Sequence, residues 1–282
     1  MIKASALKPM METNTVLQKP IIETSTMPQR PETESVVQIS TSSHFQNMKI
    51  VLQNERPYPS VVEDMATKMM DIYDDIEGAL HIIYKAYEQE EQKFVIPMLG
   101  KNSARRQIVL DWMEDMKAVI GEYFYDRKTN CIIGSVEDVP RARKFLIGGF
   151  LEIAIAKQTQ KIVSELADKY QQPFEVQTNV VVSAKDSMAP QNEFDVVIMF
   201  GKILYVIEIK SGKSFRDYSK YYSVGRRYGI VPNRILLVDS CLKEWEADMA
   251  EYFAEYYVAT IHSFEEKLIR MLSQDMEVKK NA

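Results

Sequence analysis

The chain has 282 residues, and 46% of them are hydrophobic, which is enough for one large domain or two small ones with a filled core. A formal net charge of -5 excludes a protein that binds nucleic acid through its whole surface. Two cysteines without CxxC spacing exclude a disulfide framework. No stretch approaches the roughly 20 apolar residues of a membrane span, so we expect a cytoplasmic protein.

The first part of the chain has the composition of a disordered tail. Residues 1–44 hold six Ser, six Thr and four Pro, and none of the 28 aromatic residues of the chain. Such a segment buries too little apolar surface to offset the entropy that ordering costs. We therefore predict a disordered tail over residues 1–45, with a partner-binding arm as the alternative.

Residues 46–139 have mainly helical patterns. After a short strand expected at 48–52, the capping-box pair Ser60 and Glu63 begins a long amphipathic helix that reaches about Tyr87. A second helix is expected from Ser103 to Phe124, so that the two form a helical hairpin joined through 94–101. We predict a helical accessory region over 46–139, in which residues 60–124 offer a surface for a protein partner.

Residues 140–282 mix helical and strand patterns, which predicts an α/β domain. Two apolar runs, 194–200 and 203–209, are typical of strands buried on both faces. The other strands are expected at 174–183 and 234–238, and the helices at 150–170, 214–228, 241–256 and 263–274.

The turn between the two apolar runs brings three charged residues together. Gly201 and Lys202 separate the runs, and glycine supplies the positive φ that a type II′ turn needs at its first position. Counting back from this turn places Asp195 opposite Glu208 and points Lys210 to the same face. Two facing carboxylates repel each other, so a positive charge must compensate them.

These residue types suit the hydrolysis of a phosphodiester. Mg²⁺ prefers oxygen ligands, and a bound divalent ion makes water more acidic and offsets charge on a phosphate, while a lysine orients or deprotonates the nucleophile. Only three histidines are present, without metal-ligand spacing, so zinc is not expected. The alternative is a structural ion pair where the hairpin meets solvent.

The same stretch resembles a known family. The segment from Asn192 to Lys213 contains N-E-F-D followed by L-Y-V-I-E-I-K-S-G, and it resembles the core motif of the PD-(D/E)XK nuclease superfamily. It is most similar to the nuclease domain of the CRISPR ancillary nucleases activated by cyclic oligoadenylate, from about Phe145 to Ser240. The resemblance implies a restriction-endonuclease-like mixed sheet flanked by helices over 140–282. The sensing domain of those nucleases is not expected at 46–139.

The resemblance also implies a role for each residue of the site. Asp195, Glu208 and the main-chain carbonyl of Ile209 would bind the metal, and Lys210 would be the catalytic lysine. Glu152, in the stretch G-G-F-L-E, would match a glutamate of the preceding helix and provide a further ligand. A charge that interacts with the helix dipole is the alternative explanation of Glu152, and Glu165 is the alternative ligand.

A basic segment follows the predicted catalytic strand. Between Lys210 and Arg234 there are seven basic residues and one acid, which suits contact with a nucleic-acid backbone. The predicted nucleic-acid-binding residues are Lys213, Arg216, Lys220, Arg226 and Arg227. A second basic cluster, Arg141, Arg143 and Lys144, is interpreted as the solvated approach to a helix.

We therefore expect a Mg²⁺- or Mn²⁺-dependent endonuclease that cleaves DNA or RNA and does not associate with membranes. Paired cuts and the long helices are compatible with a homodimer. The alternative is a catalytically inactive nuclease-like fold that serves as a nucleic-acid-binding or protein-assembly module. The residues leave the choice between DNA and RNA open.

Overall fold

The computed structural model describes residues 48–52, 58–89, 91, 93–137, 139–184, 192–212 and 218–280. The predicted tail over 1–45 lies outside these ranges, as do Lys213 and Arg216. The described residues belong to one compact unit. Within them, no helix combines the length and the apolar character that crossing a bilayer requires.

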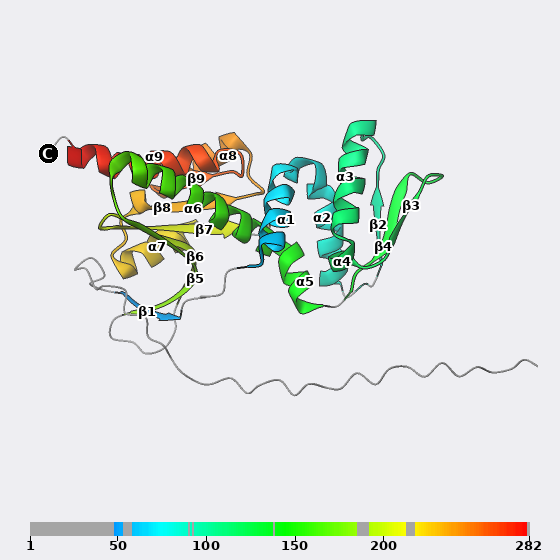
Figure 1. Cartoon of the computed structure of the whole chain (residues 1–282), viewed down its shortest axis with the longest axis horizontal. Coiled ribbons are helices and arrows are strands. Elements are labelled where there is room, and N and C mark those ends of the chain that lie inside the picture. The colour runs from blue at the N-terminus through cyan, green and yellow to red at the C-terminus, as the bar shows by residue number, and fades with distance from the viewer. Residues whose placement is uncertain are drawn as a thin grey trace, which may run out of the picture. The chain divides into compact units, whose positions relative to one another are not determined.

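The larger sheet is mixed and has six strands, in the order β1-β5-β6-β7-β8-β9; several of them are labelled in Figure 1. The first four strands in this order pair antiparallel, while β7 pairs parallel with β8, and β8 with β9. The strands are β1 (Met48–Leu52), β5 (Phe174–Ala184), β6 (Asn192–Phe200), β7 (Ile203–Lys210), β8 (Ile235–Asp239) and β9 (Tyr257–Ala259). All but β9 were predicted.

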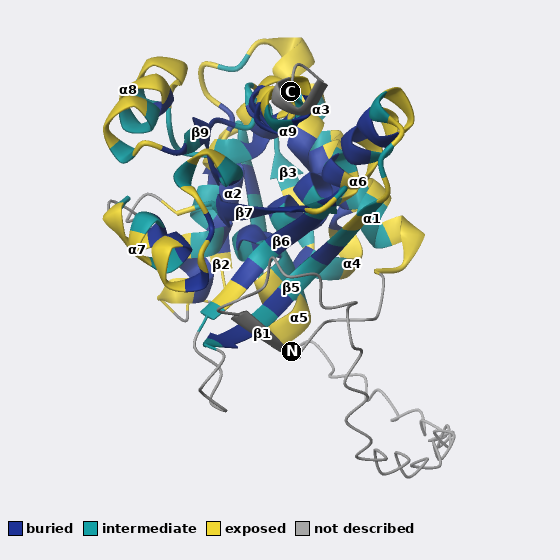
Figure 2. Cartoon of the chain, turned by 90° about the vertical axis from the view of Figure 1, so that its left-hand side faces the viewer, coloured by how far each residue is buried: buried dark blue, intermediate teal, exposed yellow. Residues whose placement is uncertain are grey.

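Helices cover both faces of this sheet (Figure 2). Tyr205 and Ile207 of β7 belong to the buried cluster that includes α6 (Phe150–Tyr170) and α9 (Phe264–Lys280). Leu204 and Val206 belong to a second cluster with α7 (Ser219–Tyr228) and α8 (Glu244–Ala254). The fold is thus mixed α/β, and the prediction that these strands are buried on both faces is confirmed.

Both helices predicted before residue 124 are interrupted in the structure. The single long helix expected from Ser60 is broken at Ile72 into α1 (Ser60–Asp71) and α2 (Tyr73–Glu88). The break accompanies a change of neighbour, because α1 packs against α6, whereas α2 packs against β2 (Lys93–Pro97) and the next helix. Periodicity alone gives no sign of that change. The next helices are α3 (Ser103–Asp115) and α4 (Lys117–Ile120).

A second, three-stranded antiparallel sheet was not predicted. Its order is β2-β4-β3, with β3 at Tyr123–Asp126 and β4 at Cys131–Ser135. The helix expected to reach Phe124 instead ends before Gly121, which has a φ of 96°, a conformation that glycine adopts without steric cost. Such short strands carry little periodicity, and their pairing is not local in sequence.

Contacts cross the predicted boundary at residue 140. One buried cluster contains residues of α1, α2 and α3 together with residues of α6, β6 and β7. The Tyr73 hydroxyl of α2 also donates a hydrogen bond to Ser240 Oγ, just beyond β8, at 3.1 Å. The division into an accessory region and a nuclease-like domain stays a prediction.

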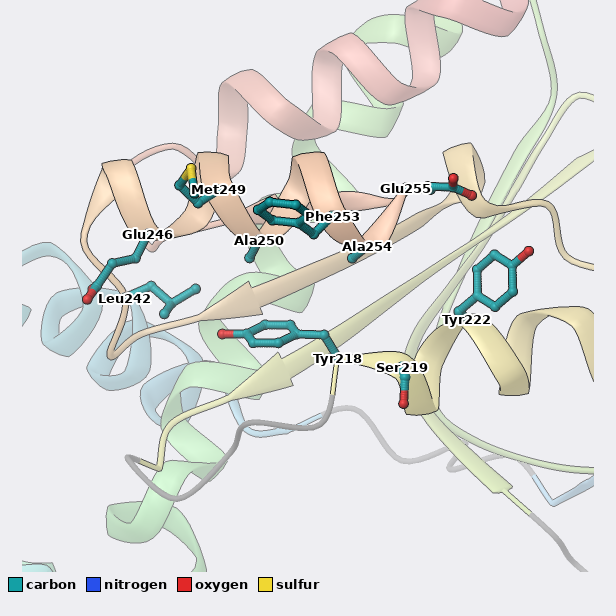
Figure 3. Close-up of a pocket in the computed structure, with 10 residues that line it drawn as sticks. All are labelled: Tyr218, Ser219, Tyr222, Leu242, Glu246, Met249, Ala250, Phe253, Ala254 and Glu255. Atoms are coloured by element: carbon teal, nitrogen blue, oxygen red, sulfur yellow. The ribbon is translucent and has the colours of Figure 1, made fainter.

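Helix α8 exposes large apolar side chains to solvent, while one of its acids, Glu251, pairs with α9. Glu251 forms ion pairs with Lys267 and Arg270 of α9. The exposed side chains of α8 include Trp245, Met249, Tyr252 and Phe253. A groove of about 600 Å³ runs between α7 and α8, lined by apolar side chains of both helices (Figure 3).

The Gly201 turn generates a stability prediction. Its φ is 63°, and a Cβ there would lie 2.7 Å from Gln172 Oε1. We expect Gly201→Ala to lower the free energy of unfolding by about 1–2 kcal/mol, measured by chemical denaturation.

Gly78 provides the matched control, because it lies in α2 and a Cβ there would meet no atom within 4 Å. Gly78→Ala should instead raise the free energy of unfolding by roughly 0.5–1 kcal/mol, since alanine loses less entropy in a helix. Equal effects of the two substitutions would contradict a strained turn at Gly201.

Candidate active site

The candidate site lies at the end of the β6–β7 hairpin remote from its turn. Five residue pairs connect the strands, from Phe200–Ile203 at the turn to Val196–Ile207. This is the register predicted from a two-residue turn. The ladder ends one pair before Asp195 and Glu208, where Asp195 Oδ2 instead accepts a hydrogen bond of 2.7 Å from the Ile209 backbone N–H. The Asp195 carboxylate is thereby fixed against the strand that carries Glu208.

The Lys210 ammonium group lies among three oxygen atoms. It donates hydrogen bonds to the Ile209 carbonyl at 2.9 Å and to Glu208 Oε2 at 3.4 Å. Its distance to Asp195 Oδ2 is 3.8 Å. Oxygen atoms of three of the four residues predicted as metal ligands, Asp195, Glu208 and Ile209, therefore converge on one cationic group. Their role as ligands stays a prediction.

Burial disfavours the ionised form of the two carboxylates. Glu208 is only 6% exposed, and burial, with repulsion from Asp195, raises its pKa to about 8 although Lys210 opposes the change. Burial also raises the pKa of Asp195, against the attraction of Lys210 and the hydrogen bond from Ile209. Burial acts to lower the pKa of Lys210, but the two carboxylates outweigh it and raise that pKa. With both carboxylates ionised, the site would hold two negative charges against the single positive charge of Lys210.

Two glycines bring the start of α6 to this site. Helix α5 (Pro140–Lys144) leads into a π-helical turn, Phe145–Gly149, which continues into α6. A Cβ on Gly148 would lie 2.2 Å from Ser211 Oγ, and that hydroxyl donates a hydrogen bond of 3.0 Å to the Ile147 carbonyl. The glycine therefore allows the turn to pack against the residue that follows Lys210.

Glu152 lies in the first turn of α6, near the other carboxylates. Burial raises its pKa, repulsion from Asp195 adds to this, and Lys144 and Lys210 oppose it. Glu152 is thus within electrostatic reach of Asp195. Within the described part of the chain, however, no three His, Cys, Asp or Glu side chains are grouped closely enough to hold one metal ion. The alternative residue, Glu165, is exposed several turns farther along α6.

The oxygen atoms around Lys210 suit a small divalent cation. Two carboxylates and one carbonyl are the hard ligands that Mg²⁺ prefers. They already surround a positive charge, although at distances longer than the roughly 2.0–2.1 Å of a Mg²⁺–oxygen bond. The residues present therefore fit such an ion in chemistry, provided that the ammonium group withdraws as the ion binds.

Helix α7 borders the site with both aromatic and basic residues. The Lys210 ammonium lies 5.8 Å from the centre of the Tyr221 ring, and Tyr221 is buried in the core between α7 and the sheet. Three predicted nucleic-acid-binding residues, Lys220, Arg226 and Arg227, are exposed on this helix. Lys220 is near enough to lower the pKa of Glu208, so the basic face of α7 begins beside the site.

Two neighbours of the site were not identified from the sequence. Asp239 lies at the end of β8 in register with Lys210, is 2% exposed, and accepts a hydrogen bond from the Cys241 N–H at 2.9 Å. Lys144 of α5 acts on the pKa of both Glu152 and Asp195. The sequence contains a signal for each. Asp239 is an acid at the end of a buried strand, and Lys144 belongs to the basic cluster that precedes the Gly-Gly pair.

Comparison with known proteins shows a shared fold. The chain matches no family model and no curated protein. Among solved structures, it is similar to Can2 from Sulfobacillus thermosulfidooxidans, determined in complex with cyclic tetra-adenylate. The sequence identity is 18% and the TM-score 0.50, over 80% of this chain and 56% of Can2. This likeness is one of fold.

Two further structures are similar to smaller degrees. Protein VC1899 from Vibrio cholerae has 17% identity and a TM-score of 0.47, over 77% of this chain and 55% of its own. A type III CRISPR defence DNA nuclease activated by cyclic oligoadenylate has 16% identity and a TM-score of 0.32, over 69% of this chain and 22% of its own. The chain spans about half the length of Can2 and VC1899.

The raised pKa of Glu208 generates a prediction for stability against pH. A carboxyl group whose pKa is raised by folding stabilises the fold only while it is protonated. Its contribution is therefore complete below the ordinary value of 4.5 and is lost as the pH rises through about 8. Glu208→Gln should be more stable than the wild type above this range, by on the order of 2 kcal/mol, in denaturation experiments with chelator.

Glu175→Gln is the control, because it alters an exposed carboxylate on β5, a strand of the same sheet. It should show no such gain at high pH. If the stability gained by Glu208→Gln did not grow with pH, the buried Glu208 carboxylate would not destabilise the fold as described.

Proposed function

We propose that the chain is a Mg²⁺- or Mn²⁺-dependent nuclease that hydrolyses phosphodiester bonds of DNA or RNA. The observation that carries the proposal is the convergence of Asp195 Oδ2, Glu208 Oε2 and the Ile209 carbonyl on one cationic point. Their residue types and spacing are those of the PD-(D/E)XK motif. We infer accordingly that the mixed sheet is of the restriction-endonuclease-like type.

The fold agrees with this inference. The sequence resemblance points to the nuclease domain of CRISPR ancillary nucleases activated by cyclic oligoadenylate. The similar solved structure, Can2, was determined with cyclic tetra-adenylate bound. The resemblance of the motif and the likeness of the fold thus lead independently to related proteins.

The chain would contribute to hydrolysis in three ways. Asp195, Glu208 and the Ile209 carbonyl would hold the divalent ion, which supplies Lewis acidity, making water more acidic and offsetting charge on the phosphate. Lys210, released from the carboxylates by the ion, would orient the attacking water and neutralise the phosphate. Glu152, whose pKa is raised, would bind the ion or accept a proton. Water adds to phosphorus, one P–O bond breaks, and the leaving oxygen takes up a proton.

Substitutions at the site should remove cleavage without unfolding the chain. We expect Lys210→Ala and Asp195→Asn each to slow cleavage of labelled DNA or RNA by at least about a hundredfold, in assays with Mg²⁺ or Mn²⁺ and with chelator. Melting curves check that both variants fold.

Lys202→Ala is the matched control, because Lys202 is an exposed lysine at the turn of the same hairpin. It should cleave at the wild-type rate. Cleavage that survives in Lys210→Ala, or that persists in chelator, would rule out the proposed chemistry.

Metal binding is testable without a substrate. An ion that binds only the folded chain raises its stability, by about 2.7 kcal/mol at a hundredfold excess over the dissociation constant. We therefore expect Mn²⁺ to raise the melting temperature of the wild type, and Asp195→Asn to lose most of this response. Titration calorimetry on the same pair measures the affinity directly.

One observation favours a second candidate, a nuclease-like module that binds nucleic acid or assembles with proteins without catalysis. The Lys210 ammonium already occupies the point on which the two carboxylates converge, and the described residues contain no group of three His, Cys, Asp or Glu side chains that could hold a metal ion. A wild type that neither responds to Mn²⁺ nor cleaves, yet binds nucleic acid, would establish this candidate instead.

A further inference from the structure

Helix α5 carries three basic residues in a single turn. Arg141, Arg143 and Lys144 are all exposed, and among the described residues none of them forms an ion pair. The guanidinium of Arg143 lies 5.9 Å from the centre of the Tyr87 ring, a cation–π contact that leaves its hydrogen-bond donors available. In a chain of net charge -5, three neighbouring cations that form no close ion pair repel each other and attract an anion.

A cleft connects these cations with the candidate site. Its volume is about 350 Å³, and its walls include Arg143, Lys144, Gly148, Glu152 and Ser211. Ser211 directly follows Lys210, and Glu152 lies in the first turn of α6. Figure 1 shows α5 leading into α6 beside the sheet. An anion in this cleft would therefore adjoin the residues proposed to act on the phosphodiester.

Basic residues thus flank the carboxylates from two different helices. Lys144 of α5 lines the same cleft as Glu152. Lys220 of α7 lies 5.9 Å from the centre of the Tyr221 ring, and the Lys210 ammonium lies 5.8 Å from the same ring. Lys144 and Lys220 belong to elements far apart in the sequence, with the carboxylate-bearing hairpin between them in the chain. A polyanion with regularly spaced charges can contact both sides while it crosses the carboxylates.

We propose that Arg143 and Lys144, assisted by Arg141, form a second phosphate-binding site for the backbone of a nucleic-acid strand. This site holds the strand on the Glu152 side of the carboxylates, while the basic face of α7 holds it on the other side. The proposal rests on the proposed function for the identity of the strand as substrate. A guanidinium group suits this role because its planar donors can bind two phosphate oxygens at once.

The test measures binding and not cleavage. The full-length chain is titrated against a fluorescently labelled single strand in chelator, and the fluorescence anisotropy is followed at several salt concentrations. We expect Arg143→Ala/Lys144→Ala to weaken binding at least tenfold. The slope of log affinity against log salt should fall by about 0.7 for each phosphate contact that is lost.

The control variant removes two equally exposed cations elsewhere. Arg127 and Lys128 lie in the turn between β3 and β4, and Arg127→Ala/Lys128→Ala changes the net charge by the same amount. It should retain the wild-type slope. Lys144→Arg, which keeps the charge, should retain wild-type affinity, and Lys144→Ala alone provides the test if the double variant fails to fold.

The outcomes separate this proposal from the proposed function. Equal affinities and slopes for the α5 double variant and its control, or a wild type that binds no nucleic acid, would overturn the α5 site. A selective loss of binding in the α5 variant, in a chain that never cleaves with Mg²⁺ or Mn²⁺, would support the site and reject the enzyme. Normal binding by the α5 variant, in a chain whose wild type does cleave, would reject the site alone.

Discussion

The central constraint on this protein is the buried negative charge at the end of one hairpin. Asp195 and Glu208 lie where water screens them poorly, and the pKa values of both are raised. One ammonium group, on Lys210, balances part of this charge through contacts of 2.9–3.8 Å with three oxygen atoms. These buried charges lower the stability of the fold, because apolar residues at such positions often stabilise a core more. Their presence is therefore better explained by a function than by stability.

The rest of the structure holds these residues in place from several directions. The β6–β7 register fixes the two carboxylates relative to each other, and parallel pairing with β8 fixes the strand of Glu208. Gly148 lets the start of α6 pack against Ser211. Tyr221 of α7 packs beside Lys210. Each contact comes from a different element, so the site depends on the completed fold and not on a single loop.

The hairpin, and with it the core of the site, could be predicted from the sequence because its geometry is local. A two-residue glycine turn and the alternation of side chains along a strand were enough to bring Asp195, Glu208 and Lys210 together. The position of Lys144 and the second sheet depend on contacts between segments far apart in the chain, which periodicity does not encode. Asp239 was missed for the same reason, since only pairing between β7 and β8 places it beside Lys210.

The turn at Gly201 has an effect at the opposite end of its hairpin. Surface turns commonly tolerate an added residue, but here one extra residue would shift β6 against β7 and move alternate side chains to the wrong face. The spacing of the two acids would then be lost, although neither acid had been altered. An insertion at this exposed turn would therefore disrupt a site at the other end of the hairpin. Related chains should accordingly vary less in the length of this turn than its exposure alone suggests.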